Sequence, residues 1–458
     1  MATVLHGEAE DLAILENKRE ELRSEGVEHC LSAYVDVHGV AKAKAVPIDH
    51  FVSMMRGSEL FTGAAIDGLG QEPSDDELAV IPDIDRITIL PWEPTVAWAP
   101  GHLHYHGEPW PMDSRQVLRK QVERAAARGW VFNLGIETEF FLVQRENGAI
   151  RPANPLDVIP RAAYDIVGLL ENLPFMDQLI KYMNQLGWDV HSYDHEDANS
   201  QFEFDFSYTD CMGMADRLVL WRMMTKSLAR RFGWEATFMP KPYGDRTGSG
   251  GHFNMSVAAA GTGENLFAAE DDPRGCGISE LAYRFIAGIL AHAPAIVAVT
   301  CPTVNSYKRL VLTGSMTGFT WAPVHISYGN NNRTHMLRVP MTSPRIESRA
   351  VDIAVNPYLG AAMMLAAGLD GVERELDPGD PIALNMYTQT PERIRELEVK
   401  QLPRTLLEAV EAFDADPLSE QVFGPELKAA YCELKEREWW EFHNEVSQWE
   451  IDRYLSFF

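Results

Sequence analysis

The amino-acid sequence predicts an α+β fold with two domains. Segments of strand character come in groups instead of alternating regularly with helices, which argues against a doubly wound parallel sheet. The chain has 458 residues, of which 46% are hydrophobic, so it can bury a large core and form more than one domain. The boundary is predicted near residues 106–112, which gives domains at residues 1–108 and 109–458.

The first domain is predicted to contain a β-hairpin. The segments CLSAYVDV and AKAKAVPI flank His38-Gly39, which suits the turn between two half-buried strands. A glycine-rich stretch follows at residues 62–70, and the segment ITILPWEPTVAWAP then alternates apolar residues with proline.

The second domain is predicted to mix helices and strands. Ser114 is expected to cap a helix that runs through VLRKQVERAAAR and stops at Gly129. FNLGIETEFFLVQ, SQFEFDFSY, HFNMSVAA and HMLRVP are predicted strands, and residues 215–231 have helical periodicity. Asn356-Pro357 starts a helix through YLGAAMMLAAGL, with asparagine as the cap and proline in the first turn.

Charge and cysteine content exclude several classes of protein. Lys and Arg number 40 against 67 Asp and Glu, for a formal charge of -27. A surface this acidic argues against a nucleic-acid or anionic-membrane partner; the surplus serves either solubility or a divalent-metal site. The five cysteines are scattered and show neither disulfide-framework nor zinc spacing. The N-terminal segment has no apolar signal region and the apolar stretch around residues 285–299 is too short to span a bilayer, so we expect a cytoplasmic enzyme.

Acidic residues recur at strand spacing in two segments. Glu137 and Glu139 in GIETEFF, and Glu203, Asp205 and Ser207 in QFEFDFSY, are two residues apart and so share a strand face. Carboxylates on an inward face repel one another unless a cation joins them. A solvent-facing acidic side is the alternative for either strand alone, but two such strands together favour metal.

Oxygen ligands of this kind suit Mg²⁺ or Mn²⁺ better than zinc. Glu196 lies seven residues before Glu203 and extends the acidic set. His252 is either a nitrogen ligand or an ordinary core histidine, and its local sequence alone favours the core.

Two further segments indicate substrate binding. The loop FMPKPYGDRTGSGGHFNMS is rich in glycine but is not a Walker A loop; it is either a flexible connection or a place where backbone approaches a substrate. Five arginines fall within about forty residues of one another, which suggests anion recognition, although salt bridges to the excess acids could explain one or two. They are Arg309, Arg333, Arg338, Arg345 and Arg349. Together with the acids they suggest phosphoryl transfer from a nucleotide to an anionic acceptor.

These segments resemble the glutamine synthetase family over nearly the whole chain. The motifs are GIETEFF, HEDANSQFE, FMPKP with GSGGHFNMS, NSYKRL, NNNR with LRVP, and RIESR followed by NPYLGAAMMLAAGLDG. The resemblance implies an N-terminal β-grasp domain and a C-terminal catalytic domain with an antiparallel sheet and surrounding helices. It also implies an ATP-dependent ligase that makes a γ-glutamyl phosphate from glutamate and passes the γ-glutamyl group to an amine.

The resemblance assigns roles to individual residues. It implies two or more Mg²⁺ or Mn²⁺ ions, one held by Glu139, Glu196 and Glu203 and another by Glu137, His252 and Glu347. Glutamate would be bound by Glu139, Gly248, His252, Arg309 and Arg349. ATP would be bound by Asn254, Ser256, Arg333, Arg338 and Arg345. Arg309, Arg333 and Arg349 would serve catalysis; Asn254 stands where the family usually has histidine, so its role is less secure.

The sequence departs from the family where ammonium binds. The family uses an aspartate in an FDGSS-like loop of the neighbouring subunit and a glutamate just before an Ala-Pro pair in a mobile flap. Here the loop reads FTGAA, with Thr62 at the aspartate position, and the flap reads LTGSMTGFTWAP, with Thr320 and Trp321 before Ala-Pro. Without both acids the pocket is less charged and more apolar, which suits an amine that carries carbon.

The closest resemblance is therefore to γ-glutamylmethylamide synthetases and related enzymes, with methylamine as the first choice and larger alkyl or aryl amines next. The first alternative is an authentic glutamine synthetase, in which another acid such as Asp67 moves in. A non-catalytic structural or ATP-sensing relative is the second. The resemblance also implies a homo-dodecamer of two stacked hexamers with active sites between subunits, in which the aromatic ending WEIDRYLSFF docks into the opposite ring. Tyr387 lies where some relatives are adenylylated, but its surroundings favour a structural tyrosine.

Overall fold

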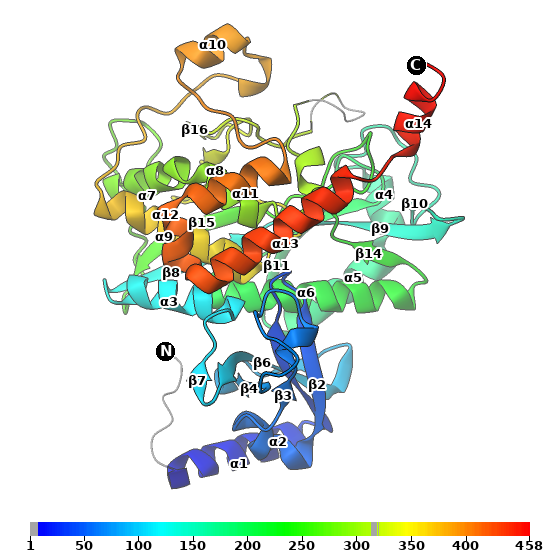
Figure 1. The fold of residues 1–458 in the computed structure, drawn as a ribbon, viewed down its shortest axis with the longest axis vertical. Helices are drawn as coiled ribbons and strands as arrows, with labels where there is room; N and C mark the ends of the chain where they lie inside the picture. The colour runs from blue at the N-terminus through cyan, green and yellow to red at the C-terminus, as the bar shows by residue number, and fades with distance from the viewer. Residues whose placement is uncertain (1–7, 313–317, 319) are drawn as a thin grey trace.

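The computed structural model describes residues 8–312, 318 and 320–458 (Figure 1). Six of the twelve residues of the flap segment LTGSMTGFTWAP, at positions 313–317 and 319, lie outside the described residues. Figure 1 shows the N-terminal sheet with α1 and α2 below a larger body of helices and sheets. The architecture is α+β, as the sequence predicts.

The N-terminal sheet has seven strands in the order β2-β1-β6-β4-β3, with β5 and β7 paired to β6. The central strands β1 and β6 are parallel, whereas β1 and β2 form the predicted antiparallel hairpin around His38-Gly39. Its elements are α1 (Glu8–Ser24), β1 (His29–Val35), β2 (Ala41–Pro47), α2 (Phe51–Met55), β3 (Leu60–Phe61), β4 (Leu78–Pro82), β5 (Thr88–Leu90), β6 (Glu93–Tyr105) and β7 (Glu108–Pro109). This central parallel pair, with helices covering one face, is the β-grasp arrangement.

The central strands β1 and β6 of this sheet are buried on both faces, whereas the edge strand β2 is largely exposed. Apolar residues of α1 and α2, among them Leu15 and Phe51, pack on one face and form a core of their own. The other face joins the main core through Trp98 and Leu103. The hairpin turn is fixed to the second domain because Asn356 donates hydrogen bonds to main-chain oxygens at positions 36 and 37. The 108/109 boundary stays a prediction.

Two sheets form the centre of the larger body. The first has five antiparallel strands: β9 (Thr138–Glu146), β10 (Ala149–Pro152), β11 (Val190–His195), β12 (Gln201–Phe206) and β14 (Glu235–Thr237). The second has six: β8 (Trp130–Ile136), β13 (Thr209–Asp210), β15 (Phe253–Ala259), β16 (Tyr328–Asn330), β17 (Leu337–Val339) and β18 (Ile346–Ser348). The second sheet is antiparallel except where β16 pairs with β17.

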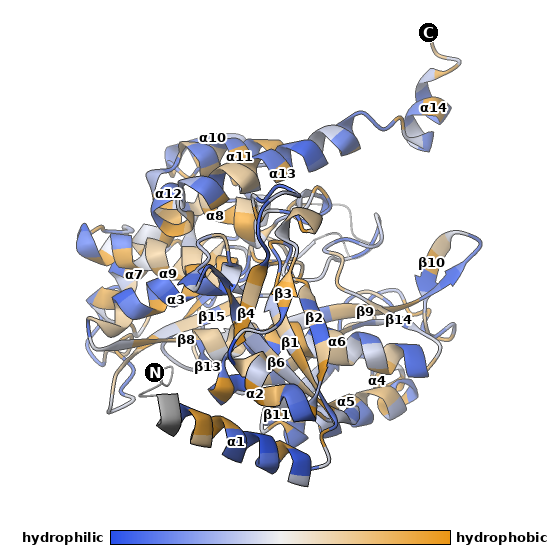
Figure 2. Cartoon of the chain, turned by 60° about the horizontal axis from the view of Figure 1, so that its bottom comes forward, coloured by the Kyte–Doolittle hydropathy of each residue, from blue (hydrophilic) through white to orange (hydrophobic). Residues whose placement is uncertain are grey.

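Helices pack around these sheets: α3 (Ser114–Ala126), α4 (Ile166–Glu171), α5 (Leu173–Gln185), α6 (Cys211–Arg231), α7 (Glu280–Ala291), α8 (Ala293–Thr300), α9 (Pro357–Glu373), α10 (Pro391–Glu396), α11 (Leu406–Ala415), α12 (Pro417–Phe423), α13 (Pro425–His443) and α14 (Gln448–Tyr454). Figure 2 shows apolar residues concentrated on the interior helices and strands. The helix α9 is buried almost all round, and Asn356 caps it as predicted. The predicted cap of α3 was wrong: Asp113 accepts the hydrogen bond from the backbone of Arg115, while Ser114 donates to the oxygen of Val35.

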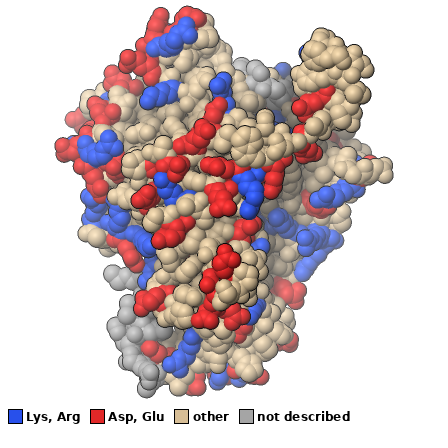
Figure 3. Space-filling model, viewed as in Figure 1, with Lys and Arg blue, Asp and Glu red and all other residues tan. Residues whose placement is uncertain are grey.

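Among the described residues, no single helix has the length and apolar character needed to cross a membrane. The pair α7 and α8 passes that test only when joined, with a bend of 77° between the two helices. Acidic and basic side chains are interspersed over the face drawn in Figure 3, so the net charge of -27 is not gathered into one patch there.

Candidate active site

The register of β9, β11 and β12 gathers the acidic residues. Glu203 of β12 lies directly opposite Glu139 of β9 and opposite Asp194 of β11. Directly opposed side chains on one sheet face are close neighbours. Three carboxylates from three strands therefore point into one space, which strand alternation alone could not establish.

The sequence suggested that Glu137 and Glu139 lie on one continuous strand, and that prediction was wrong. β8 ends at Ile136 and β9 begins at Thr138, so the chain passes from one sheet to the other at Glu137. The backbone of Glu137 donates to the oxygen of His252 (3.2 Å) and that of Glu139 to the oxygen of Gly250 (3.4 Å). The glycine-rich loop thus replaces a sheet partner at this crossover. Both carboxylates still reach the same cavity, but they enter different ligand groups.

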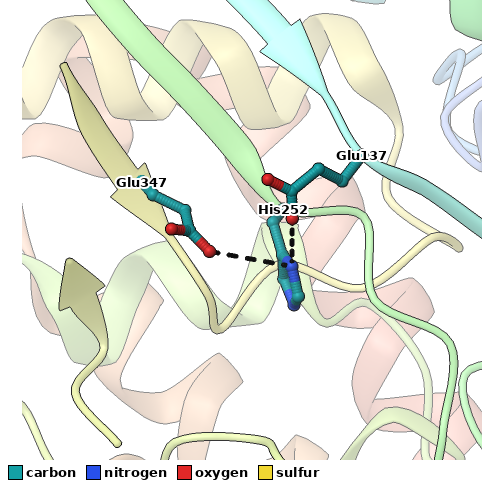
Figure 4. Close-up of side chains that lie close together, drawn as sticks. All are labelled: Glu137, His252 and Glu347. Atoms are coloured by element: carbon teal, nitrogen blue, oxygen red, sulfur yellow. Dashed lines mark hydrogen bonds and ion pairs between the residues drawn. The ribbon is translucent and has the colours of Figure 1, made fainter. Parts of the chain in front are cut away.

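Two groups of side chains have the spacing of a metal site. Figure 4 shows Glu137, His252 and Glu347 converging from the crossover, the loop before β15 and strand β18. His252 Nδ1 lies 2.7 Å from Glu137 Oε2 and 3.9 Å from Glu347 Oε1. The second group is Glu139, Glu203 and His252, and Glu196 lines the same cavity. His252, which the residues alone left as a core histidine, therefore belongs to both groups.

The charges in this cluster are strongly coupled. Burial raises the pKa of Glu203 well above its usual range, and the charge of Glu137 raises it further. Burial likewise raises the pKa of Glu196 to about 7 and raises that of Glu139, with help from Glu196. Burial also opposes ionisation of Glu137, but the hydrogen bond and charge of His252 outweigh it and lower that pKa to about 2. A divalent cation would remove this repulsion, and oxygen ligands with one imidazole nitrogen fit Mg²⁺ or Mn²⁺.

Three of the five arginines, Arg309, Arg338 and Arg349, lie beside Glu347 or His252. Glu347 accepts from Arg338 Nη1 (2.7 Å) and also pairs with Arg349. Arg309 donates to the main-chain oxygens of Arg349 (3.1 Å) and Ala350 (2.9 Å), with Nη2 also 3.2 Å from His252 Nε2. Guanidinium groups held in this way are already ordered, so an anion can bind them at low entropic cost.

These groups line a cavity of about 570 Å³, which we call the first cavity. It is lined by most of the residues predicted for metal, glutamate and amine, and by the three arginines predicted for catalysis: Glu137, Glu139, Glu196, Glu203, Gly248, His252, Arg309, Thr320, Trp321, Arg333 and Arg349. A larger cavity of about 990 Å³ lies between α6 and β14, and neither metal-type group lines it.

A second cavity of about 500 Å³ adjoins the first and shares Glu137, Ser192 and Asp205 with it. Three of the residues predicted for ATP, Asn254, Ser256 and Arg345, line this second cavity. Arg345 Nε donates to Asn254 Oδ1 (2.8 Å), and Asn254 in turn donates to Glu137 Oε1 (3.0 Å). A hydrogen-bonded chain therefore connects the two cavities. Of the other two predicted ATP residues, Arg333 lines the first cavity and Arg338 pairs with Glu347.

Residues 247–252 of the glycine-rich loop are buried and tightly packed, which favours the interpretation of a close backbone approach over that of a flexible connection. A side-chain carbon at Gly248 would lie 2.3 Å from the oxygen of Pro240, and one at Gly250 would lie 2.6 Å from both Glu139 Oε1 and His252 Nε2. Only glycine lets the backbone pass this close to the acidic cluster.

Two residues named from the sequence do not reach this cavity within a single chain. Thr62 lies between β3 and the short helix Gly63–Ala65 of the N-terminal domain. Asp67, considered as a substitute acid, pairs instead with His38 (3.2 Å) and Arg437 (3.6 Å). The resemblance places the Thr62 loop at a neighbouring subunit, and that placement stays a prediction. Tyr387 donates to the oxygen of Arg333 at 3.5 Å, consistent with a structural role.

Sequence reasoning missed several residues at the site. Tyr164 and Asp197 line the first cavity, and Tyr208 lines the second. Gln201 is fully buried and donates to Glu139. Asp197 and Gln201 stand inside HEDANSQFE, beside residues already selected, so the motif was a signal for them; Tyr164 and Tyr208 carry no comparable signal.

Comparison with known proteins gives a consistent result. The glutamine synthetase catalytic domain model matches residues 111–454. The chain is 40% identical to a glutamate–methylamine ligase of Methyloversatilis universalis over 95% of its length and 98% of that protein. It is 36% identical to a glutamine synthetase of Rhizobium leguminosarum bv. phaseoli, again over 95% and 98%. A solved GmaS/ADP complex superimposes with a TM-score of 0.89 at 38% identity, covering 95% of this chain and 99% of that one, and apo GmaS does so with 0.87 at 37%, covering 96% and 99%. Given the length of these matches and the acid, histidine and arginine groups in the cavity, the chain belongs to the glutamine synthetase family of ligases.

Proposed function

We propose that the enzyme joins the γ-carboxylate of L-glutamate to a small alkyl amine, with methylamine as the first candidate, at the expense of ATP. One observation carries the choice of amine: Trp321 lines the cavity that also contains the metal-type acids and the anion-binding arginines. The relative named glutamate–methylamine ligase, which matches nearly the full length, supports the same choice.

The metal and glutamate assignments are those implied by the family resemblance, and the grouping of Glu137, His252 and Glu347 and the closeness of Glu139 to Glu203 support them. Glu139, Glu196 and Glu203 would hold one divalent ion, and Glu137, His252 and Glu347 another. Mg²⁺ or Mn²⁺ there would neutralise charge on ATP and the glutamate carboxylate, which otherwise repel one another. Arg309 and Arg349 lie beside these acids and would bind the carboxylates of glutamate.

ATP is assigned to the second cavity. Its lining by Asn254, Ser256 and Arg345 supplies donors for a nucleotide. Because this cavity joins the first at Glu137, the terminal phosphate can extend toward glutamate while the base remains distant. Arg333 in the first cavity, together with Arg338 beside Glu347, would then contact the transferring group.

The reaction proceeds in two balanced steps. The γ-carboxylate oxygen of glutamate attacks the terminal phosphorus of ATP, the bond to the bridging oxygen breaks, and ADP leaves with that electron pair. The alkylammonium gives one proton to the carboxylate of Asp197, and the neutral amine nitrogen attacks the acyl carbon. Phosphate then leaves with the electron pair of the broken C–O bond and takes up the second proton of the nitrogen as the amide forms. Arg309, Arg333 and Arg349 would stabilise the charge that spreads over the phosphoryl oxygens and the acyl oxygen.

The amine end of the cavity combines aromatic and acidic groups. Tyr164, Thr320 and Trp321 line the first cavity, and no glutamate stands directly before Ala322-Pro323. Aromatic faces attract an alkylammonium and contact its carbon atoms. We assign the charge-holding role to Asp197, since this carboxylate lines the same cavity next to Glu196.

The test is ATP-dependent phosphate release with glutamate and a panel of ammonium, methylamine, ethylamine, isopropylamine, ethanolamine, putrescine and aniline. The proposal predicts that a carbon-bearing amine gives a higher kcat/KM than ammonium, and that Trp321→Glu shifts the preference toward ammonium. A wild-type preference for ammonium would instead identify a glutamine synthetase.

A purely structural role is tested separately by calorimetry. The ligase proposal predicts ATP binding that requires Mg²⁺, whereas a structural relative binds no ATP. This experiment needs no amine, so it separates failure of the ligase assignment from failure of the amine assignment.

We further propose a homo-dodecamer of two stacked hexamers. Figures 1 and 2 show α14 apart from the body of the chain, and its end exposes apolar side chains, with Trp449 at 62%, Leu455 at 76% and Phe458 at 94% exposure. Such an ending on a lone chain is a liability that docking to a second copy removes. Light scattering should give about 620 kDa, twelve times the 51.4 kDa chain, and deletion of residues 447–458 should give smaller species.

A further inference from the structure

Gln201 is the first residue of β12, and its bonds join three parts of the active site. Its side chain is fully buried. Nε2 donates to Glu139 Oε2 and to the main-chain oxygen of Gly248, both at 3.0 Å. Its own main-chain oxygen accepts from the backbone of Glu196 at 2.9 Å. One residue therefore contacts two metal-type acids and the glycine-rich loop.

The orientation of the Gln201 amide is fixed by its partners. Glu139 Oε2, as a carboxylate oxygen, and the Gly248 carbonyl accept hydrogen bonds, so the nitrogen must face them. The amide oxygen then accepts from the hydroxyl of Thr247 at 2.8 Å. A flipped amide would leave two acceptors facing its oxygen. In this orientation Glu139 Oε2 is occupied, and Oε1 is the oxygen that faces His252, at 4.0 Å from Nε2.

We infer that Gln201 is a positioning residue that couples metal binding at Glu139 to glutamate binding at the Gly248 loop. The inference rests on the proposed glutamate and metal sites. The amide holds the carboxylate of Glu139 in one rotation, so that a single oxygen is presented to an ion. The same nitrogen donates to the Gly248 carbonyl, so that a movement of the loop also moves the carboxylate of Glu139. An ordinary buried glutamine would satisfy its amide without joining two substrate-contacting elements.

The variant Gln201→Met keeps the length of the side chain and removes all three side-chain hydrogen bonds. Hydrogen-bond partners of metal ligands typically change affinity by about 10- to 100-fold when removed. We expect Gln201→Met to weaken both Mn²⁺ binding and glutamate binding by this amount in calorimetry, and to raise the KM for glutamate more than it lowers kcat. The affinity for ATP should change by less than about threefold, since Gln201 does not contact the second cavity.

Two further variants keep the test decisive. Thr247→Val removes only the hydroxyl that orients the amide, so it should produce a smaller loss in the same two affinities even if Gln201→Met does not fold. Gln116→Met, at a buried glutamine on α3, should leave both affinities unchanged. Unchanged Mn²⁺ and glutamate affinities in a folded Gln201→Met, with only a lower Tm, would overturn the inference. Absence of glutamate binding in the wild-type protein would instead reject the proposed function.

Discussion

Gly250→Ala tests the acidic cluster with the addition of one methyl group. The new carbon would lie 2.6 Å from Glu139 Oε1 and from His252 Nε2, while ordinary contact begins near 3.4 Å. Either both ligand atoms or the loop must therefore move by about 0.8 Å. Metal–ligand distances tolerate only about 0.2 Å, so one or both proposed metal groups lose their geometry. Gly250 does not have a positive φ, so backbone strain does not confuse the result.

A displacement of this size predicts a loss of about 100-fold or more in activity and in Mn²⁺ affinity. Phosphate release and calorimetry with Mn²⁺ measure the two quantities, and circular dichroism checks the fold. Gly244→Ala is the matched control, because it lies in the same loop with nothing within 4 Å of the added carbon, and it should behave as wild type. A folded Gly250→Ala enzyme that binds Mn²⁺ within threefold of wild type would refute the assignment of Glu139 and His252 as ligands.

Three further predictions address other parts of the molecule. Glu203→Ala should abolish turnover by removing a metal ligand while light scattering still shows the intact oligomer; full activity would contradict the metal assignment. Arg345→Ala should weaken ATP binding by about tenfold or more, through loss of a charged donor in the second cavity, without changing glutamate affinity in calorimetry. His292 is buried, which disfavours its charge, but two flanking aspartates outweigh burial and raise its pKa above 6.5. Its charged form therefore stabilises the fold below pH 6.5, and this contribution is lost as pH rises through the raised pKa. His292→Gln should lower Tm more at pH 6 than at pH 9; an equal loss at both would contradict this.

Strand alternation predicted the acidic faces but not their arrangement. Residues two apart on a strand share a face whatever the register, so Glu203 and Asp205 could be placed together from the sequence. The pairing of Glu203 with Glu139 depends on how β12 lies against β9, which is set by contacts distant in sequence. The break at Glu137 could not be predicted from alternation either, because the apolar and acidic residues of GIETEFF continue the strand pattern where the chain leaves one sheet for the other.

The family resemblance named acids and a histidine that the fold brings together, and their role as metal ligands stays a prediction. The motif HEDANSQFE contains Gln201 but does not give it a role, because its three side-chain hydrogen bonds are seen only in the folded chain. Tyr164 was missed because a lone tyrosine in a loop carries no periodicity. The sequence of the glycine-rich loop does not distinguish a flexible connection from a close backbone approach. The atoms around Gly248 and Gly250 do, because they leave no room for a side-chain carbon.

Arg349 connects Trp321, which we assign to the amine pocket, with the proposed site of the γ-glutamyl group. Its guanidinium pairs with Glu347 and donates to the main-chain oxygens of Arg333 (3.1 Å) and Trp321 (3.4 Å). The backbone that carries Trp321, which has a φ of +58°, is thereby held by an arginine that we assign to the γ-glutamyl group. A change at Trp321 that shifts this backbone should therefore alter the KM for glutamate as well as for the amine. If Trp321 acts only through contact of its side chain with the amine, the KM for glutamate stays unchanged. The KM values for glutamate and for the amine, measured on Trp321→Glu and Trp321→Phe, therefore show whether Trp321 only lines the amine pocket or also connects the amine and glutamate sites.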